Sequence, residues 1–153
     1  MDIDESIDVL NNLIVLNNDR IDGYKAAYSE TYKEELRDLF TTFQQTSQKC
    51  KQELESEVKR LNGIPEEGTM ILGKLHRGWM DIKAAIMGSD SEAILDSCEY
   101  GDQTIIRAYQ DALEEENKAI TFEQRTMLNH QLALLKADYE KVKAMQDLMK
   151  NEV

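Results

Sequence analysis

The sequence predicts an all-α protein: a four-helix bundle with a long helical crossover between its second and third helices. Apolar residues recur at steps of three and four along most of the chain, which is the period of an amphipathic helix. The 153 residues include one proline and seven glycines, so few positions interrupt a helix. No stretch of useful length alternates apolar and polar residues as a strand does. We therefore expect one helical domain spanning residues 1–153.

The first two helices are expected to form an antiparallel hairpin. The first helix should run from Asp4 to about Tyr28, and the second should follow a capping-box pattern from Thr31 to Glu34 and stop at Gly63 in the C′ position. The first apolar seam comprises Ile7, Leu10, Ile14, Asn17, Ile21, Tyr24 and Tyr28. The second comprises Leu36, Leu39 with Phe40, Phe43, Cys50, Leu54, Val58 and Leu61.

A second hairpin is expected after residue 88. A capping-box pattern from Ser89 to Glu92 opens its first helix, and another from Thr121 to Gln124 opens its second. The buried positions are expected to be Ile94, Cys98, Ile105, Tyr109 and Ala112, then Leu128, Leu135, Val142, Met145 and Met149. Helices of about 25 residues are about 38 Å long, so two hairpins of matched length can pair as a bundle.

The segment between the hairpins, about residues 64–88, is too long for a simple turn. It can travel the length of the bundle, which would make the second and third helices parallel, as in ferritin-like folds. Within it, Ile71, Leu75, Trp79, Ile82 and Ile86 step by three or four, which predicts an amphipathic helix with Trp79 as its anchor. An apolar patch around Leu72 and Trp79 is the predicted interface of a homo-oligomer.

Five pieces of the chain carry a family resemblance: LNNLIVLNNDRIDGY at 10–24, ELESEVKRLNGIPEEGT at 53–69, GKLHRGWMDIKAAI at 73–86, CEYGDQTIIRAYQDAL at 98–113 and the region around Gln131 in the last helix. On these segments the chain resembles a bacterial family of ferritin-like four-helix-bundle proteins catalogued as a domain of unknown function. The resemblance covers nearly the whole chain. It implies the fold and an evolutionary relation to di-iron carboxylate bundles, and it implies no established activity.

Several polar residues occupy seam positions where a simple bundle would have leucine. A di-iron bundle needs a carboxylate from each of two helices and a Glu-x-x-His from each of the other two. The sequence leaves the cofactor unknown. If a metal such as iron binds, the candidate ligands are Glu99, Asp102, Asp138, Asn17 and Gln131. Glu99 and Asp102 are spaced i, i+3, so both can face one side of a turn.

Other features weaken the prediction of a metal site. Glu53 is expected about ten residues, or about 15 Å, below the layer of candidate ligands. Neither His76 nor His130 completes a Glu-x-x-His. The alternative for these interior polar residues is a hydrogen-bonded polar core or a water-filled cavity.

The net charge of −12, from 30 acidic and 18 basic residues, makes nucleic acid an unexpected partner. The longest apolar runs, such as LIVL at 13–16, are far shorter than the roughly 20 residues that span a bilayer, so no membrane association is expected. The acidic start MDIDESID lacks the basic region of a signal peptide, which favours a cytoplasmic location.

Cys50 and Cys98 belong to no metal-binding spacing and are expected to be buried thiols.

The sequence contains no glycine-rich phosphate loop, nucleophile elbow or Ser/His pattern. The leading hypothesis is a non-catalytic binding scaffold or stress-associated protein with a degenerate metal site. The alternative is a non-haem di-iron oxidoreductase or iron-handling protein. A third, weaker hypothesis is a carrier whose acidic cavity takes small cations such as polyamines.

Overall fold

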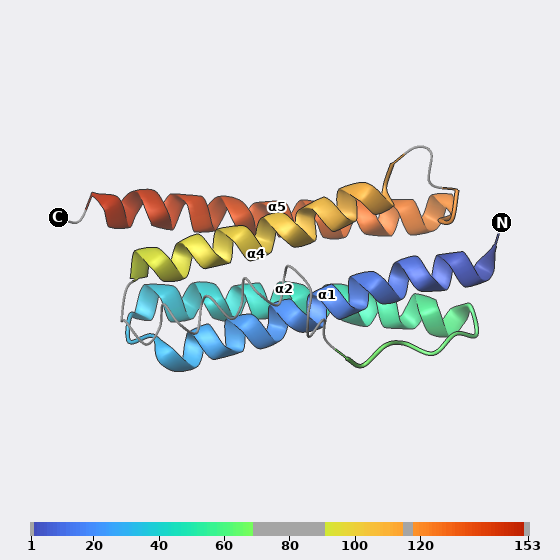
Figure 1. The fold of residues 1–153 in the computed structure, drawn as a ribbon, viewed down its shortest axis with the longest axis horizontal. Helices are drawn as coiled ribbons and strands as arrows, with labels where there is room; N and C mark the ends of the chain where they lie inside the picture. The colour runs from blue at the N-terminus through green and yellow to red at the C-terminus, as the bar shows by residue number, and fades with distance from the viewer. Residues whose placement is uncertain (1, 69–90, 115–117, 152–153) are drawn as a thin grey trace.

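The computed structural model describes residues 2–68, 91–114 and 118–151, and these residues form four α-helices with no strand among them. The helices are α1 (Ile3–Glu30), α2 (Glu34–Arg60), α4 (Ser91–Ala112) and α5 (Phe122–Lys150) (Figure 1). The all-α prediction is confirmed. The predicted connector helix with Leu72 and Trp79, and the capping box at Ser89, lie outside the described residues.

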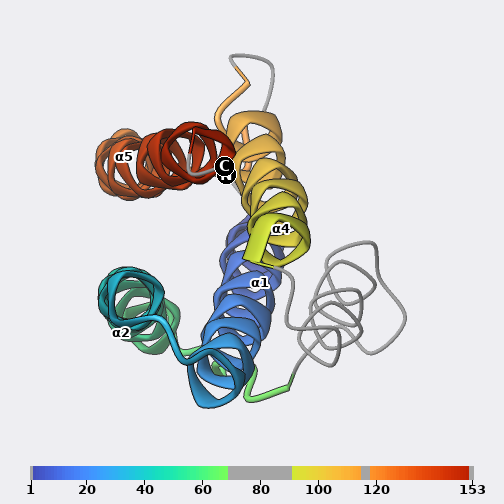
Figure 2. The same cartoon turned by 90° about the vertical axis from the view of Figure 1, so that its left-hand side faces the viewer.

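The four helices lie side by side in a ring. In it α1 contacts α2 and α4, and α5 contacts α4 and α2. Figure 2 shows this arrangement from one end. In Figure 1, α1 and α5 run from right to left, whereas α2 and α4 run from left to right. Both predicted antiparallel hairpins are therefore present, and α2 and α4 point in the same direction.

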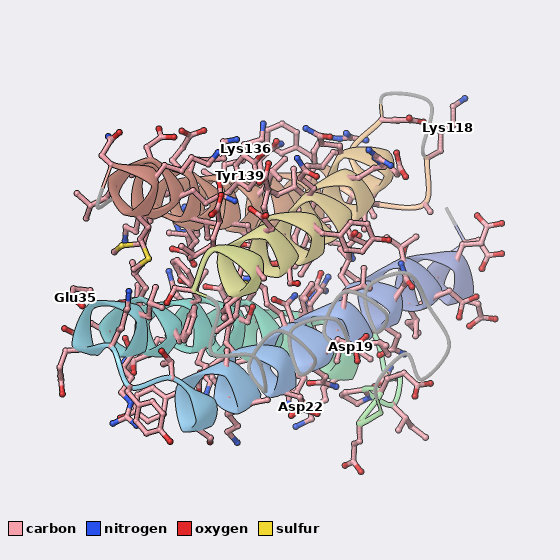
Figure 3. All side chains as sticks on the ribbon, turned by 60° about the vertical axis from the view of Figure 1, so that its left-hand side comes forward. Asp19, Asp22, Glu35, Lys118, Lys136 and Tyr139 are labelled. Carbon is pink, nitrogen blue, oxygen red and sulfur yellow. The ribbon has the colours of Figure 1, made fainter. Side chains whose placement is uncertain are left out.

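The apolar seams of all four helices meet in one core. The buried apolar residues include Leu10, Ile14, Tyr24, Leu36, Phe40, Phe43, Leu54, Val58, Ile94, Ile105, Tyr109, Leu128, Leu135 and Val142. Charged side chains such as Asp22 and Glu35 are exposed on the outside (Figure 3). None of the described helices combines the length and apolar content that crossing a membrane requires.

The predicted seam of α1 is wrong at its last position. Tyr28 is 40% exposed, and Ala27 is buried in its place. A strict heptad step drifts by about 20° per seven residues around a straight helix, so the buried face moves off a seven-residue repeat over the length of α1.

The boundary between α1 and α2 also differs from the prediction. Thr31 is the C-cap of α1, and its backbone N–H donates to the Ala27 carbonyl at 3.2 Å. The N-cap of α2 is Lys33, which makes no side-chain cap. The Thr31 carbonyl accepts a hydrogen bond from Arg37 Nε at 2.8 Å, which holds the turn against α2. The capping box predicted at Thr31 is therefore wrong.

At the end of α2, the residue with positive φ is Asn62, at 64°, and not Gly63. The Asn62 N–H donates to the Lys59 carbonyl at 2.9 Å and the Gly63 N–H donates to the Val58 carbonyl at 2.9 Å. This is the pattern of a Schellman cap, with Asn62 in the C′ position. Glycine is required at position 63 for lack of space and not for its backbone angle, because a Cβ there would lie 2.9 Å from Ile7 Cδ1.

The capping box at the start of α5 is confirmed. The Gln124 N–H donates to Thr121 Oγ1 at 3.1 Å, and the Thr121 N–H donates to Gln124 Oε1 at 2.9 Å. Gln124 also donates through Nε2 to Glu57 Oε2 of α2 at 2.9 Å. The start of α5 is thus fixed both locally and to the end of α2.

Candidate functional site

A fully buried arginine on α1 binds groups from all three other described helices. Arg20 donates to both oxygens of Asp102 on α4, from Nε to Oδ1 at 3.0 Å and from Nη2 to Oδ2 at 3.3 Å. Its Nη2 also donates to Asp138 Oδ2 on α5 at 3.2 Å. Its Nη1 donates to the Phe43 carbonyl and to Ser47 Oγ on α2, each at 3.0 Å. We call this cluster, together with Tyr24, the Arg20 layer.

The charges of the Arg20 layer are almost completely removed from water. Arg20, Asp102 and Asp138 are 0%, 1% and 3% exposed. Burial raises the pKa of Asp102, although the positive charge and hydrogen bonds of Arg20 oppose that rise. Burial by itself would lower the pKa of Arg20, but the charges of Asp102, Tyr24 and Asp138 and the hydrogen bond to Asp102 together raise that pKa, so the guanidinium stays charged. The layer therefore holds one permanent cation between two carboxyl groups.

Two neighbouring aromatic rings lie beside the guanidinium. The Arg20 Cζ atom lies 5.1 Å from the ring centroid of Tyr24 and 5.5 Å from that of Phe43. The two rings meet edge to face at 5.0 Å. Tyr24 also donates its hydroxyl to Asp102 Oδ1 at 3.1 Å. The two rings lower the local dielectric around the guanidinium. The low dielectric strengthens the ion pairs of Arg20 with Asp102 and Asp138, and breaking either ion pair therefore costs more free energy.

A second buried chain of hydrogen bonds crosses the four helices next to this cluster. Asn17 Nδ2 on α1 donates to the Tyr109 hydroxyl on α4 at 3.0 Å, and that hydroxyl donates to Gln131 Oε1 on α5 at 2.7 Å. Gln131 Nε2 then donates to Glu53 Oε1 on α2 at 3.0 Å and to the Cys50 carbonyl at 3.4 Å. We call these residues the Tyr109 layer. Burial raises the pKa of Tyr109 well above its ordinary value, so the hydroxyl remains a donor.

The five predicted metal ligands are distributed over three separate places. Asp102 and Asp138 both lie on Arg20, whereas Asn17 and Gln131 belong to the Tyr109 layer. Glu99 lies in neither layer and is partly exposed.

Glu99 instead accepts from Gln146 Nε2 at 2.8 Å and from Lys143 Nζ at 3.3 Å. These hydrogen bonds, that of Gln146 first, lower the pKa of Glu99. The predicted i, i+3 partnership of Glu99 with Asp102 therefore does not produce a shared site.

The prediction that Glu53 lies far below the candidate ligands is wrong. Glu53 bonds directly to Gln131, and Gln131 is joined through Tyr109 to Asn17. The turn between α1 and α2 lies later in the chain than predicted, with Lys33 instead of Thr31 as the N-cap of α2, so the residues of α2 lie at other levels than expected. Two long side chains, Gln131 and Glu53, also shorten the remaining distance by reaching toward each other.

The residues of the Arg20 layer do not fit a di-iron centre. Asp102 and Asp138 already direct their oxygens at a guanidinium, whose positive charge would repel a divalent ion placed among them. Within the described ranges, no group of three or more His, Cys, Asp or Glu side chains is arranged to hold a metal ion. His130 lies exposed on α5, where its Nε2 is 3.4 Å from Lys49 Nζ.

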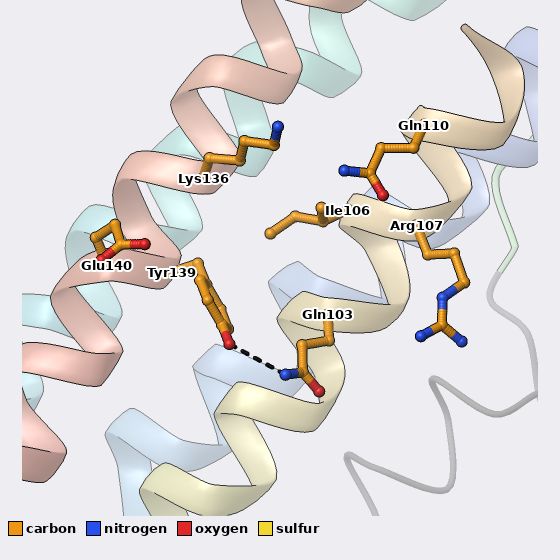
Figure 4. A pocket seen from close by; sticks show the side chains of 7 residues that line it. All are labelled: Gln103, Ile106, Arg107, Gln110, Lys136, Tyr139 and Glu140. Carbon is orange, nitrogen blue, oxygen red and sulfur yellow. Dashed lines mark hydrogen bonds between the residues drawn. The ribbon is translucent and has the colours of Figure 1, made fainter. Parts of the chain in front are cut away.

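In the part of the chain that the structure describes, four surface grooves are found, and none is lined by a residue of the two layers. A groove of about 380 Å³ between α4 and α5 is lined by Gln103, Ile106, Arg107, Gln110, Lys136, Tyr139 and Glu140 (Figure 4). Its two cations, Arg107 and Lys136, distinguish it from the acidic cavity that a polyamine carrier would need. A second groove, between α1 and α4, carries the carboxylates Asp8 and Asp111, and both are exposed. The buried polar layers therefore act within the interior of the bundle.

The sequence prediction missed Arg20. Its position contained a usable signal, because Arg20 lies three residues after Asn17 and four before Tyr24, on the same face of α1. An arginine within an apolar seam requires a buried acceptor. The seam carboxylates Asp102 and Asp138 were available as those acceptors.

Comparison with known proteins gives a family and no function. No curated protein matches the sequence significantly. The profile of a family described as a domain of unknown function, DUF2383, matches residues 5–115. The matched span includes α1, α2 and α4, and with them Arg20, Ser47 and Asp102. Because the match covers well over half of the chain, this protein belongs to the DUF2383 family.

Proposed function

We propose that this protein is a non-catalytic ferritin-like bundle that acts as a binding scaffold or in a stress response. The observation that carries the proposal is the placement of the Arg20 guanidinium between Asp102 and Asp138. In a di-iron bundle the interior carboxylates hold metal ions. Here the interior carboxylates of α4 and α5 bind a side chain of α1 instead, so the ancestral metal site is degenerate.

The ferritin-like relationship is supported by the direction of the helices. The end of α2 and the start of α4 lie at opposite ends of the bundle, as Figure 1 shows. In ferritin-like folds with one crossover, the second and third helices likewise run in the same direction. We propose on this ground that residues 1–153 form a single domain of that type.

A scaffold role agrees with how the polar groups are used. Within the Arg20 layer, and likewise within the Tyr109 layer, the polar side chains form hydrogen bonds with one another across the interior. Such networks fix the register of the helices. The acidic surface then remains for recognition of partners, with nucleic acid and membranes disfavoured by a net charge of −12. We propose a cytoplasmic homo-oligomer that associates through a patch including Leu72 and Trp79.

Iron loading tests the proposal against its alternative, a di-iron oxidoreductase or iron-handling protein. Protein purified without a histidine tag is exposed anaerobically to ferrous iron, desalted and analysed for metal. We expect far less than one iron per chain, both in the wild type and in Glu99→Ala. About two irons per chain, together with oxygen consumption that Asp102→Ala abolishes, would overturn the proposal and establish the alternative.

Oligomeric state tests the scaffold separately. Sedimentation at several protein concentrations should show one oligomer that Leu72→Asp and Trp79→Ala each dissociate. Circular dichroism should show unchanged helix content in both variants. A wild type that remains monomeric at high micromolar concentration would contradict the proposed assembly.

A further inference from the structure

The acceptors around the Arg20 guanidinium come entirely from helices other than α1. Phe43 and Ser47 belong to α2, Asp102 to α4 and Asp138 to α5. The contribution of α1 to these ion pairs is the guanidinium itself, carried on a flexible stem. The arrangement is therefore that of a binding site on three helices and a ligand on the fourth.

The site matches a guanidinium in the number and placement of its acceptors. A guanidinium of an arginine has five N–H donors in a planar fork. Each donor of Arg20 has one acceptor, at distances from 3.0 to 3.3 Å. Asp102 takes one edge through two parallel bonds, and Phe43 and Ser47 take the Nη1 donors. An ammonium ion has too few donors in the wrong geometry to satisfy the same set.

Charge also drives cation uptake by this site. Two carboxyl groups, Asp102 and Asp138, face the single cation, and both are at most 3% exposed. Removal of the cation would leave them buried together without a positive partner. Because an unpaired buried charge is strongly unfavourable, the empty site would bind a replacement cation that fits.

We infer that α2, α4 and α5 form a guanidinium-binding site which Arg20 fills as a tethered ligand, and which binds free guanidinium cations once that side chain is removed. The matching class of ligand is guanidinium and its small N-alkyl derivatives. The aromatic rings of Tyr24 and Phe43, 5.1 and 5.5 Å from Cζ, add cation–π attraction that favours this planar cation. This inference depends on the geometry of the layer and goes beyond the proposed scaffold function.

Chemical rescue of Arg20→Ala tests the inference in the full-length chain. The thermal midpoint is measured by circular dichroism during titration with guanidinium chloride at millimolar concentrations, well below those that unfold proteins. Sodium, ammonium and magnesium chloride at equal ionic strength serve as comparison salts. We expect a saturable rise in midpoint with guanidinium alone, of about 3 °C at ten times the dissociation constant. The wild type should show no such rise.

Two variants locate the binding. Arg20→Ala/Asp102→Asn should lose the rescue, because the bidentate acceptor is gone. Arg107→Ala removes an exposed arginine of α4 and should respond to guanidinium as the wild type does. A rise that survives in Arg20→Ala/Asp102→Asn would place the bound cation elsewhere and overturn the inference.

If Arg20→Ala is unfolded before any cation is added, the same titration is followed by helix content. Guanidinium should restore the helical signal, whereas the comparison salts should not. A second variant, Arg20→Met, fills the space of the aliphatic stem and repeats the measurement in a chain with fewer voids. Absence of rescue in both variants overturns the inference. Iron binding by the wild type would instead overturn the proposed function, so the two failures are distinguishable.

Discussion

Arg20 and Asp102 form a bidentate ion pair across the interior, with Nε to Oδ1 at 3.0 Å and Nη2 to Oδ2 at 3.3 Å. The pair joins α1 to α4, which belong to different hairpins. Its partner Asp138 adds α5, and the Nη1 contacts add α2. One side chain therefore couples all four described helices. The stability of the fold should depend strongly on this contact.

The two carboxylates of the Arg20 layer should differ in importance. Asp102 accepts two hydrogen bonds from Arg20 and one from Tyr24, whereas Asp138 accepts one from Arg20. We expect Asp102→Asn to lower the free energy of unfolding by about 3–5 kcal/mol and Asp138→Asn by clearly less. Urea denaturation measures both, with the exposed Asp147→Asn as control. Equal losses in the two variants would contradict this ranking.

Lysine should not replace Arg20. An ammonium offers three donors from a single point and cannot reach the carboxylate edge, the α2 carbonyl and the hydroxyl together. We expect Arg20→Lys to lower the free energy of unfolding by about 2–4 kcal/mol, as determined in urea.

Arg20→Met should be less stable than Arg20→Met/Asp102→Asn/Asp138→Asn, because the triple variant leaves no buried charge unpaired. The opposite order would show that the carboxylates are stabilised by something other than Arg20.

The Tyr109 hydroxyl should contribute measurably to stability. It accepts from Asn17 and donates to Gln131, so Tyr109→Phe leaves a buried donor and a buried acceptor without their partner. We expect a loss of about 1–3 kcal/mol in the free energy of unfolding. Tyr139→Phe is a matched control, since its hydroxyl accepts from Gln103 on the surface at 3.0 Å and its loss should change stability by less than about 0.5 kcal/mol. Similar losses in the two variants would contradict the prediction.

Alkaline pH should unfold the protein. Burial raises the pKa of Cys50 to about 12 and also raises the pKa values of Cys98, Tyr24 and Tyr109. The unfolded chain loses these protons first, from about pH 8.5 for cysteine and pH 10 for tyrosine. The folded state then binds more protons, so its stability falls as pH rises, by about 1.4 kcal/mol per pH unit for each such group.

Unfolding free energies between pH 7.5 and 10 measure that slope. The Cys50→Ala/Cys98→Ala variant should lose stability less steeply than the wild type between about pH 8.5 and 9.5, because only the tyrosines remain to titrate. An unchanged slope in the variant would show that the thiols do not contribute.

Most of the core could be predicted because helical periodicity is a local property. Ile94, Cys98, Ile105 and Tyr109 are all buried as their spacing indicates. Periodicity failed at Tyr28, where a straight helix drifts off the seven-residue repeat. The capping-box prediction was right at Thr121 and wrong at Thr31, because Thr31 ends α1 as its C-cap and α2 begins after Lys33.

The candidate site was only partly predictable. Sequence spacing identified Asp102, Asp138, Asn17 and Gln131 as interior polar residues, and all four are buried. It could not assign their partners, because a contact between helices depends on the relative height and rotation of each helix. Glu99 shows the limit, since one turn of helix separates it from Asp102 and places it with Lys143 on the partly exposed side.

The sequence alone determined the helical class, the two hairpins and most residues of the core, because helical spacing and short turns are local features. The tertiary structure decided what the interior carboxylates bind. Asp102 and Asp138 lie on different helices, and whether they face a metal or Arg20 depends on three helices meeting at one level. All five donors of the buried Arg20 have acceptors, so the packed helices leave this cation paired, and an unpaired charge there would be strongly unfavourable.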